Sequence, residues 1–403
     1  MQNKFAKPEA ATQRLARRRG CVPMLVVWLA LAGGAGASAQ QPAAGAAGAS
    51  ATERLMEQAS AARESNDVPR AIALYRQATQ VDPQYADAWW FLGFLSYAAD
   101  DYAGARSALS HFIDLKPPAG PAMALRGLCE FETRDYEASL ADIDQAIALG
   151  AANQPRNEQI LRTHQGLLLT RAGKFERAMQ SYLLLAHEGV NTPAVTLGLG
   201  MAGLRIAALP EELPAERQEV ALAAGEAALQ VVSAPPAAAG AGASPGAEAF
   251  AAFFARYPTE PEAHYLYGYL LFAAEPEAAV AQFEQELAVD RPASHASAPA
   301  HAMVAWAALM RGDPQAALGP ASDAVSADAT LPLGQLVLGR ALLETGASAA
   351  GTQHLEMARK LEPDNLETHL ALARAYSTTN HPDEARRERL LCLQLTEDHA
   401  ARP

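Results

Sequence analysis

A step of 34 residues recurs in two separate stretches of this 403-residue chain. Small, aromatic and proline positions return at that step in the first stretch, and glycine and leucine positions return near the C-terminus. The repeated pairs are Gly93 and Gly127, Tyr102 and Tyr136, Pro83 and Pro117, Ala71 and Ala105, Gly312 and Gly346, and Leu338 and Leu372. This period is typical of stacked helical hairpins, each of which buries its apolar face against its neighbours. It predicts an all-α fold built from many such hairpins.

The repeated positions have physical roles in such a hairpin. Glycine at Gly93 and Gly127 allows the two helices of one hairpin to approach closely. Gly173, Gly312 and Gly346 stand where a turn between helices needs unusual backbone angles. Proline follows the second helix because it cannot donate the next helical hydrogen bond. The other small residues expected at a helix crossing are Gly166, Gly268 and Gly339, and the closing prolines are Pro83, Pro117 and Pro363.

One repeat carries the pattern of a known family. Trp89, Leu92 and Gly93 open this repeat, Tyr102 follows its turn, and Pro117 closes it. The pattern resembles the tetratricopeptide repeat family. The resemblance implies a right-handed α-solenoid of stacked antiparallel helix hairpins. It also implies a protein that binds other proteins or peptides and is not an enzyme.

The first 39 residues are expected to be a secretory signal peptide. Six basic residues precede an apolar run from Val22 to Ala32, and residues 37–39 are the small residues that signal peptidase requires. We expect cleavage between Ala39 and Gln40, and a periplasmic or secreted protein. An uncleaved membrane anchor is the alternative, although the apolar run is shorter than the ~20 residues that span a bilayer.

Charge narrows the choice of partner. The whole chain has a formal net charge of −13 at pH 7, and removal of residues 1–39, with six basic residues and one acidic residue, leaves −18. An acidic surface repels nucleic-acid phosphates, so we expect no nucleic-acid partner. No second long apolar run follows, so we expect no membrane span after signal cleavage.

Composition and repeat register divide the rest of the chain. Residues 40–51 are expected to be a flexible leader, since they are rich in Gln, Pro, Ala, Gly and Ser. An N-terminal array over 52–232 is predicted, with a degenerate last part from 193 onward. A linker over 233–246 then precedes a C-terminal array over 247–399. The last helix, with Glu384, Arg386, Arg387, Glu388 and Arg389 close together, is expected to show the polar outer face of a terminal repeat.

Few residues of the chain point to chemistry. No phosphate loop, nucleophile elbow or dinucleotide fingerprint occurs, so no cofactor and no catalytic residue are predicted. His295 and His301 are the closest histidine pair, but their spacing does not place two ligands on one helical face, and no metal site is predicted. Cys129 and Cys392 lie in distant repeats, beyond disulfide reach, and are expected to be buried free thiols.

Aromatic residues are the better candidates for a site. In tetratricopeptide arrays the first helix of each hairpin lines a concave groove, and the resemblance places a series of large rings there. The core positions of the same helices are already filled by Trp89, Leu92 and Leu266. The rings are therefore expected to be partner anchors, with packing against a neighbouring repeat as the alternative. The candidate groove residues are Trp90, Phe94, Tyr97, Tyr265, Tyr269, Phe272 and Trp306, with Leu309 beside the last.

These observations predict an exported, non-catalytic scaffold that binds a protein or peptide in the cell envelope. The carboxylate clamp of chaperone-binding tetratricopeptide domains is missing, because its positions hold Met56, Ser60, Phe91, Pro121 and Leu125. A saccharide-binding or enzyme-accessory module is one alternative, since aromatic rings also stack on sugars. A hydrolase that uses scattered carboxylates is the other. The residues beside the rings are mostly Ala, Leu and Thr, which favours a peptide.

Overall fold

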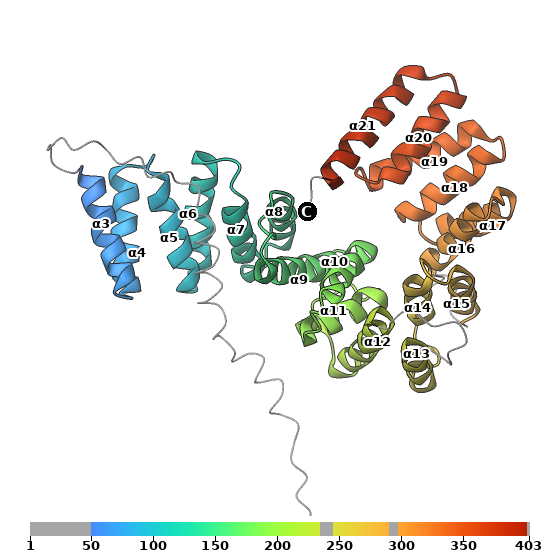
Figure 1. Cartoon of the computed structure of the whole chain (residues 1–403), viewed down its shortest axis with the longest axis horizontal. Helices are drawn as coiled ribbons and strands as arrows, with labels where there is room; N and C mark the ends of the chain where they lie inside the picture. The colour runs from blue at the N-terminus through green and yellow to red at the C-terminus, as the bar shows by residue number, and fades with distance from the viewer. Residues whose placement is uncertain (1–49, 234–244, 290–296, 401–403) are drawn as a thin grey trace, which may run out of the picture. The chain divides into compact units, whose positions relative to one another are not determined.

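The computed structural model describes residues 50–233, 245–289 and 297–400 (Figure 1). Within these ranges it contains α-helices and one short 3-10 helix, and no strand. The predicted all-α fold is thereby confirmed. The expected signal peptide (1–39) lies outside the described residues, as do most of the expected leader and linker and also His295.

The chain divides into two compact units between Leu168 and Leu169, inside helix α9. The helices of the first unit are arranged as consecutive hairpins, in which neighbouring helices pack against each other. Their bounds are α3 (Ala51–Glu64), α4 (Val68–Val81), α5 (Ala86–Ala98), α6 (Tyr102–Leu115), α7 (Gly120–Glu132) and α8 (Tyr136–Ala148), followed by α9 (Pro155–Arg171).

The second unit continues the helical order to the C-terminus. Each of its hairpins also packs mainly on the next one along the chain. The bounds are α10 (Phe175–His187), α11 (Pro193–Gly203), η2 (Pro210–Glu212), α12 (Ala215–Ser233), α13 (Pro245–Arg256), α14 (Ala263–Leu271), α15 (Pro276–Ala288), α16 (Ala298–Met310), α17 (Pro314–Ala327), α18 (Pro332–Glu344), α19 (Ser348–Leu361), α20 (Leu366–Thr378) and α21 (Pro382–Ala400).

The turns inside the hairpins have the backbone angles that the sequence predicts. Gly173, Gly312 and Gly346 have φ values of 72°, 75° and 96°, in the left-handed region that glycine adopts without strain. Other hairpins place a polar residue in the same conformation, which costs more for a residue with a Cβ atom. These residues are Asn66, Asp100, Arg134 and Asn380.

Small residues set the distance between the helices of a hairpin, as predicted. A Cβ atom added to Gly93 would lie 2.7 Å from Leu109 Cγ, and one added to Gly127 would lie 2.9 Å from Ile143 Cγ1. Gly339 has the same relation to Leu355, at 2.7 Å from its Cγ. Real Cβ atoms do not come this close to another atom, so a larger residue would push the helices apart.

The degenerate region after residue 193 is also a helical hairpin, formed by α11 and α12 with a longer connection. Pro210 begins the short 3-10 helix η2, and Pro214 directly precedes α12. The two helices approach through glycine on both sides. A Cβ atom on Gly200 would lie 1.8 Å from the backbone oxygen of Ala221, and one on Gly225 would lie 1.9 Å from that of Thr196.

The predicted division into two arrays at 233–246 stays a prediction. Helices α12 and α13, which flank the expected linker, pack against each other within the second unit. The boundary between the compact units is instead at Leu168, in the middle of the fourth hairpin.

The last helix has the expected polar outer face except at Glu388. Glu388 is buried, not on a polar outer face. Its Oε2 lies 2.5 Å from Nδ1 of His369 in α20, and its Oε1 accepts a hydrogen bond from Arg359 of α19 at 2.5 Å. The exposed surface of α21 includes Leu390, Leu391 and Leu393 in its place. The expected polar face holds for Arg386, Arg387 and Arg389, which are exposed, and fails for Glu388, because its ion partners come from two other helices.

Two further expectations concern single residues and membrane helices. Cys129 and Cys392 are buried free thiols, as predicted, and burial raises the pKa of the Cys129 thiol to about 12. Among the helices of the described ranges, none is both long enough and apolar enough to cross a membrane.

We predict that Gly200→Ala and Gly225→Ala each lower the stability of the α11–α12 hairpin by ~2 kcal/mol or more. Each added methyl group would collide with backbone atoms, which cannot rotate away. Thermal unfolding followed by circular dichroism measures the effect. The matched control is Gly334→Ala, where the nearest atom to the added Cβ is at an ordinary 3.5 Å and the change should be neutral or slightly stabilising. Equal melting temperatures for all three variants would contradict the prediction.

Candidate functional site

Four of the seven predicted groove aromatics lie in the protein core. Trp90 is 8% exposed, and Phe94, Tyr97 and Tyr265 are no more accessible. The ring of Trp90 lies 5.3 Å from that of Phe112 in α6. The expectation that these rings are surplus to the core is therefore wrong, and the alternative of packing within the array describes them.

Tyr265 also takes part in a buried polar network of the second unit. Its hydroxyl lies 3.2 Å from Oε1 of Glu176, whose carboxylate pairs with Arg205 at 2.5 Å. The Arg205 guanidinium in turn stacks on the Phe175 ring, 4.6 Å from its centroid. Burial raises the pKa of Tyr265 above its ordinary value, so this hydroxyl stays protonated. The network joins α10, α14 and the second residue after α11, and it is structural.

Trp89 was expected in the core and is only half-buried. Its ring stacks on His111 of α6 with 4.2 Å between the ring centroids, and its Nε1–H donates to the backbone oxygen of Pro83 at 2.9 Å. Trp90 is thus the more deeply buried of the two, and Trp89 packs against the edge of the same core.

The remaining predicted residues, Tyr269, Phe272 and Trp306, are half-buried, and Leu309 is buried. Trp306 has the most informative surroundings. It lies on α16, and the guanidinium of Arg340 on α18 is 5.0 Å from its ring centroid. Helices α16, α18 and α20 are the first helices of three successive hairpins, and each contacts the next.

Side chains from these three helices form one surface that contains both apolar and charged groups. On each helix the members lie three or four residues apart, which places them on one side of that helix. Members on neighbouring helices are joined by ion pairs or by the contact of Arg340 with Trp306. We call this surface the α16–α18–α20 face. It consists of Trp306, Met310, Arg340, Glu344, Glu367, Leu370 and Arg374.

The apolar members of the face include two exposed side chains. Met310 is 67% exposed and Leu370 is 47% exposed. Met310 follows Trp306 by four residues, and Leu370 precedes Arg374 by four, so each shares a helical face with the neighbour named. Exposed methionine and leucine gain free energy when a partner covers them, at about 25 cal/mol per Å² of apolar area.

The charged members of the face are held loosely. Arg340 lies 3.8 Å from Glu344 and 3.9 Å from Glu367, and Arg374 lies 3.5 Å from Glu344. The Arg374 side chain is 66% exposed. Long ion pairs with an exposed partner, such as Glu367 or Arg374, contribute only ~0–1 kcal/mol to stability. Glu367 and Arg374 can therefore change partners at little cost.

The Glu130 carboxyl has a pKa that would suit a general acid in an enzyme. Burial raises its pKa to about 7, near that of a good general acid at neutral pH. Its side chain is 4% exposed, however, and pairs with Arg106 at 3.2 Å. A substrate does not reach such a group, so Glu130 does not supply the scattered-carboxylate site of the hydrolase alternative.

In the part of the chain that the structure describes, no group of three His, Cys, Asp or Glu side chains is placed to hold a metal ion. His301, one member of the predicted pair, is half-buried in α16, and this burial lowers its pKa.

Comparisons with known proteins agree with the repeat pattern. Residues 56–120 match the family model described as tetratricopeptide repeat. No curated protein matches the chain. The helical hairpins of both units and this match define a protein with tetratricopeptide-like repeats.

Several solved structures are similar to parts of the chain. A crystal structure of MamA is 19% identical, with 38% of this chain and 88% of that chain covered and a TM-score of 0.32. YrrB, described as a TPR protein with an unusual peptide-binding site, is 14% identical, with coverages of 38% and 77% and a TM-score of 0.31. A tetratricopeptide repeat protein from Parabacteroides merdae is 13% identical, with coverages of 71% and 97% and a TM-score of 0.34. Scores this low do not establish a shared arrangement of the repeats.

Sequence reasoning found Trp306 and missed the rest of the face. The repeat period could have identified the other residues, because Trp306, Arg340 and Arg374 are spaced by 34 residues. Met310 and Glu344 have the same spacing. Reading only aromatic residues at these positions left out the arginines and glutamates that surround Trp306.

We predict that Trp90→Ala lowers the free energy of unfolding by ~3 kcal/mol, the usual cost of truncating a buried aromatic residue. Trp89→Ala should cost ~1 kcal/mol, since it removes one hydrogen bond and a stacked ring at the surface. Urea unfolding followed by far-ultraviolet circular dichroism measures both. A larger loss for Trp89→Ala than for Trp90→Ala would show that the burial of the two rings is reversed.

Proposed function

We propose that this chain is an exported, non-catalytic scaffold that holds a segment of another protein on the α16–α18–α20 face. The observation that carries the proposal is the recurrence of Trp306, Arg340 and Arg374 at the repeat period, beside exposed Met310 and Leu370. A repeat array needs small and aliphatic residues for its own packing. It has no structural need for an exposed methionine or a loosely paired arginine.

A polypeptide segment fits the face better than other ligands. Its apolar side chains would cover Met310 and Leu370, and its charged groups would exchange with the weak pairs around Arg340 and Arg374. Aromatic and arginine side chains are also the residues that most often dominate binding energies at protein interfaces. The match of residues 56–120 to the tetratricopeptide family supports the same class of partner.

The saccharide alternative requires an open aromatic face on which a sugar ring can stack. Polar groups do stand beside Trp306, as that alternative needs. The Arg340 guanidinium, however, covers one face of the Trp306 ring, at 5.0 Å from its centroid, and Trp306 is also partly buried against two core clusters. We therefore favour a polypeptide.

Export is proposed from the sequence of residues 1–39. The expected result is a mature protein that begins at Gln40 and is recovered from the periplasm or the medium. Mass analysis of the N-terminus, made on protein from fractionated cells of the source organism, tests this. Recovery of the chain with Met1 intact from the cytoplasm would overturn export and leave the binding proposal untouched.

We predict that Met310→Asp and Leu370→Asp each reduce partner capture at least tenfold, because each places a charge where the partner buries an apolar side chain. Residues 40–403 serve as bait for envelope extracts, and captured proteins are quantified by mass spectrometry. The matched control is Met357→Asp, at a methionine on α19 that is 41% exposed and lies outside the face. The proposal fails if all three variants capture the same proteins in the same amounts as the unchanged bait, or if that bait captures none.

A further inference from the structure

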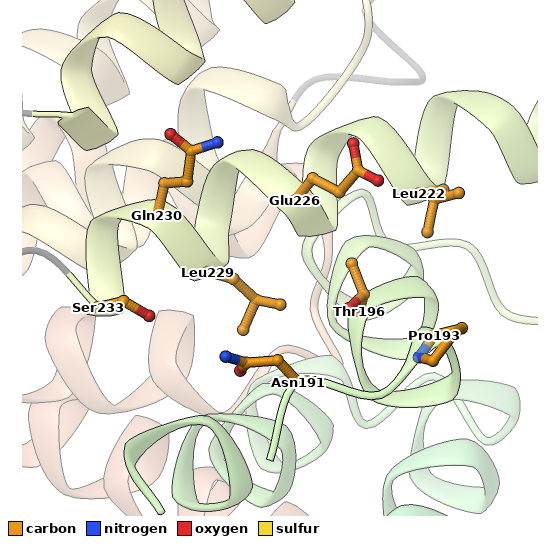
Figure 2. A pocket seen from close by; sticks show the side chains of 8 residues that line it. All are labelled: Asn191, Pro193, Thr196, Leu222, Glu226, Leu229, Gln230 and Ser233. Atoms are coloured by element: carbon orange, nitrogen blue, oxygen red, sulfur yellow. The ribbon is translucent and has the colours of Figure 1, made fainter. Parts of the chain in front are cut away.

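A separate pocket of about 510 Å³ lies on the α11–α12 hairpin (Figure 2). It is shallow and largely open to solvent. The start of α11 and the residues before it form one wall, and α12 forms the other. The lining residues are Asn191, Pro193, Thr196, Leu222, Glu226, Leu229, Gln230 and Ser233.

The floor of the pocket is apolar. Figure 2 shows Leu229 pointing from α12 toward Asn191, with Thr196 and Pro193 beyond. Leu222 lies two helical turns before Leu229 on α12 and is partly exposed. The hydroxyl of Thr196 donates to the backbone oxygen of Thr192 at 3.0 Å, so it is satisfied inside the protein. This floor suits an aliphatic side chain.

The rim of the pocket is polar and unpaired. In Figure 2 the Glu226 and Gln230 side chains project from one edge of α12, on the side away from Asn191. Among the described residues, none forms a hydrogen bond or ion pair with the side chains of Asn191, Glu226 or Gln230.

We propose that this pocket binds an extended polypeptide segment with an aliphatic side chain close to a lysine or arginine. The aliphatic side chain packs on Leu222 and Leu229. The amides of Asn191 and Gln230 can each donate and accept, which matches the alternating N–H and C=O groups of a peptide backbone. The Glu226 carboxylate pairs with the basic side chain.

Charge and length both support this occupant. No lysine or arginine lines the pocket, so an anionic ligand such as a phosphate has no countercharge there. The chain as a whole has a net charge of −13, which attracts a basic segment. From Leu222 to Ser233 the helix rises ~17 Å at ~1.5 Å per residue. An extended segment of about five residues covers that length at ~3.3 Å per residue.

The pocket and the α16–α18–α20 face share no residue. A failure at one therefore does not count against the other, and the two sites are tested with different variants.

The test is a selection of displayed random seven-residue peptides on the full chain from Gln40. We expect enrichment of peptides with Leu, Ile or Val within two positions of Lys or Arg. When the selection is repeated on the Glu226→Lys variant, the enriched peptides should carry acidic residues in place of basic ones. The matched control is Glu216→Lys, with the same charge change on the same helix outside the pocket, which should leave the preference basic.

Affinity measurements complete the test. A synthetic copy of the most enriched peptide should bind Asn191→Ala at least fivefold more weakly than the unchanged chain in a fluorescence titration. The proposal is overturned if no aliphatic–basic preference emerges. It is equally overturned if Glu226→Lys leaves the preference unchanged, or if Glu216→Lys alters it as strongly.

Discussion

The close approach of paired helices at small residues is the constraint on which the rest of the structure depends. Gly93, Gly127 and Gly339 leave room for only a hydrogen atom, and α11 and α12 meet through Gly200 and Gly225 almost backbone to backbone. Because each hairpin closes so tightly on itself, its remaining apolar surface can only be buried against the next hairpin. This sequence of local contacts explains why the structure consists of consecutive helix pairs.

The same constraint determines which side chains are buried in the core and which remain accessible to a partner. A side chain on the first helix of a hairpin is buried if the neighbouring hairpin is large enough to reach it, as Phe112 reaches Trp90. Where the neighbours carry small or flexible residues, the equivalent side chain stays accessible. Met310 is in that position, since the buried residues of α17, which packs on α16, are all alanines. The binding surface we propose is thus a consequence of which repeats are bulky and which are not.

Much of the fold could be predicted from the sequence, because periodicity reports local geometry. The glycine turns and the crossing at Gly93 were recognised from spacing alone. The fate of Trp90 was not, because its burial depends on side chains from another helix. Glu388 was misplaced for the same reason, since its partners His369 and Arg359 belong to α20 and α19. The residues that line the pocket beside Asn191 do not recur at the repeat period, so no pattern in the sequence predicted this pocket.

The geometry of the ion pairs distinguishes structural charges from those a partner can use. Arg126 holds Asp142 by two hydrogen bonds, at 2.5 and 2.8 Å, with both side chains largely buried between α7 and α8. Removing either partner would leave a buried charge, so that pair is fixed. The pairs of Arg340 and Arg374 are longer, at 3.5 to 3.9 Å, and Arg374 and Glu367 face solvent, although Arg340 and Glu344 are largely buried. Glu226 has no cation at all among the described residues. The exposed charges in these two places, Glu367, Arg374 and Glu226, do not hold the fold, so a partner's charges can compete for them without unfolding a repeat.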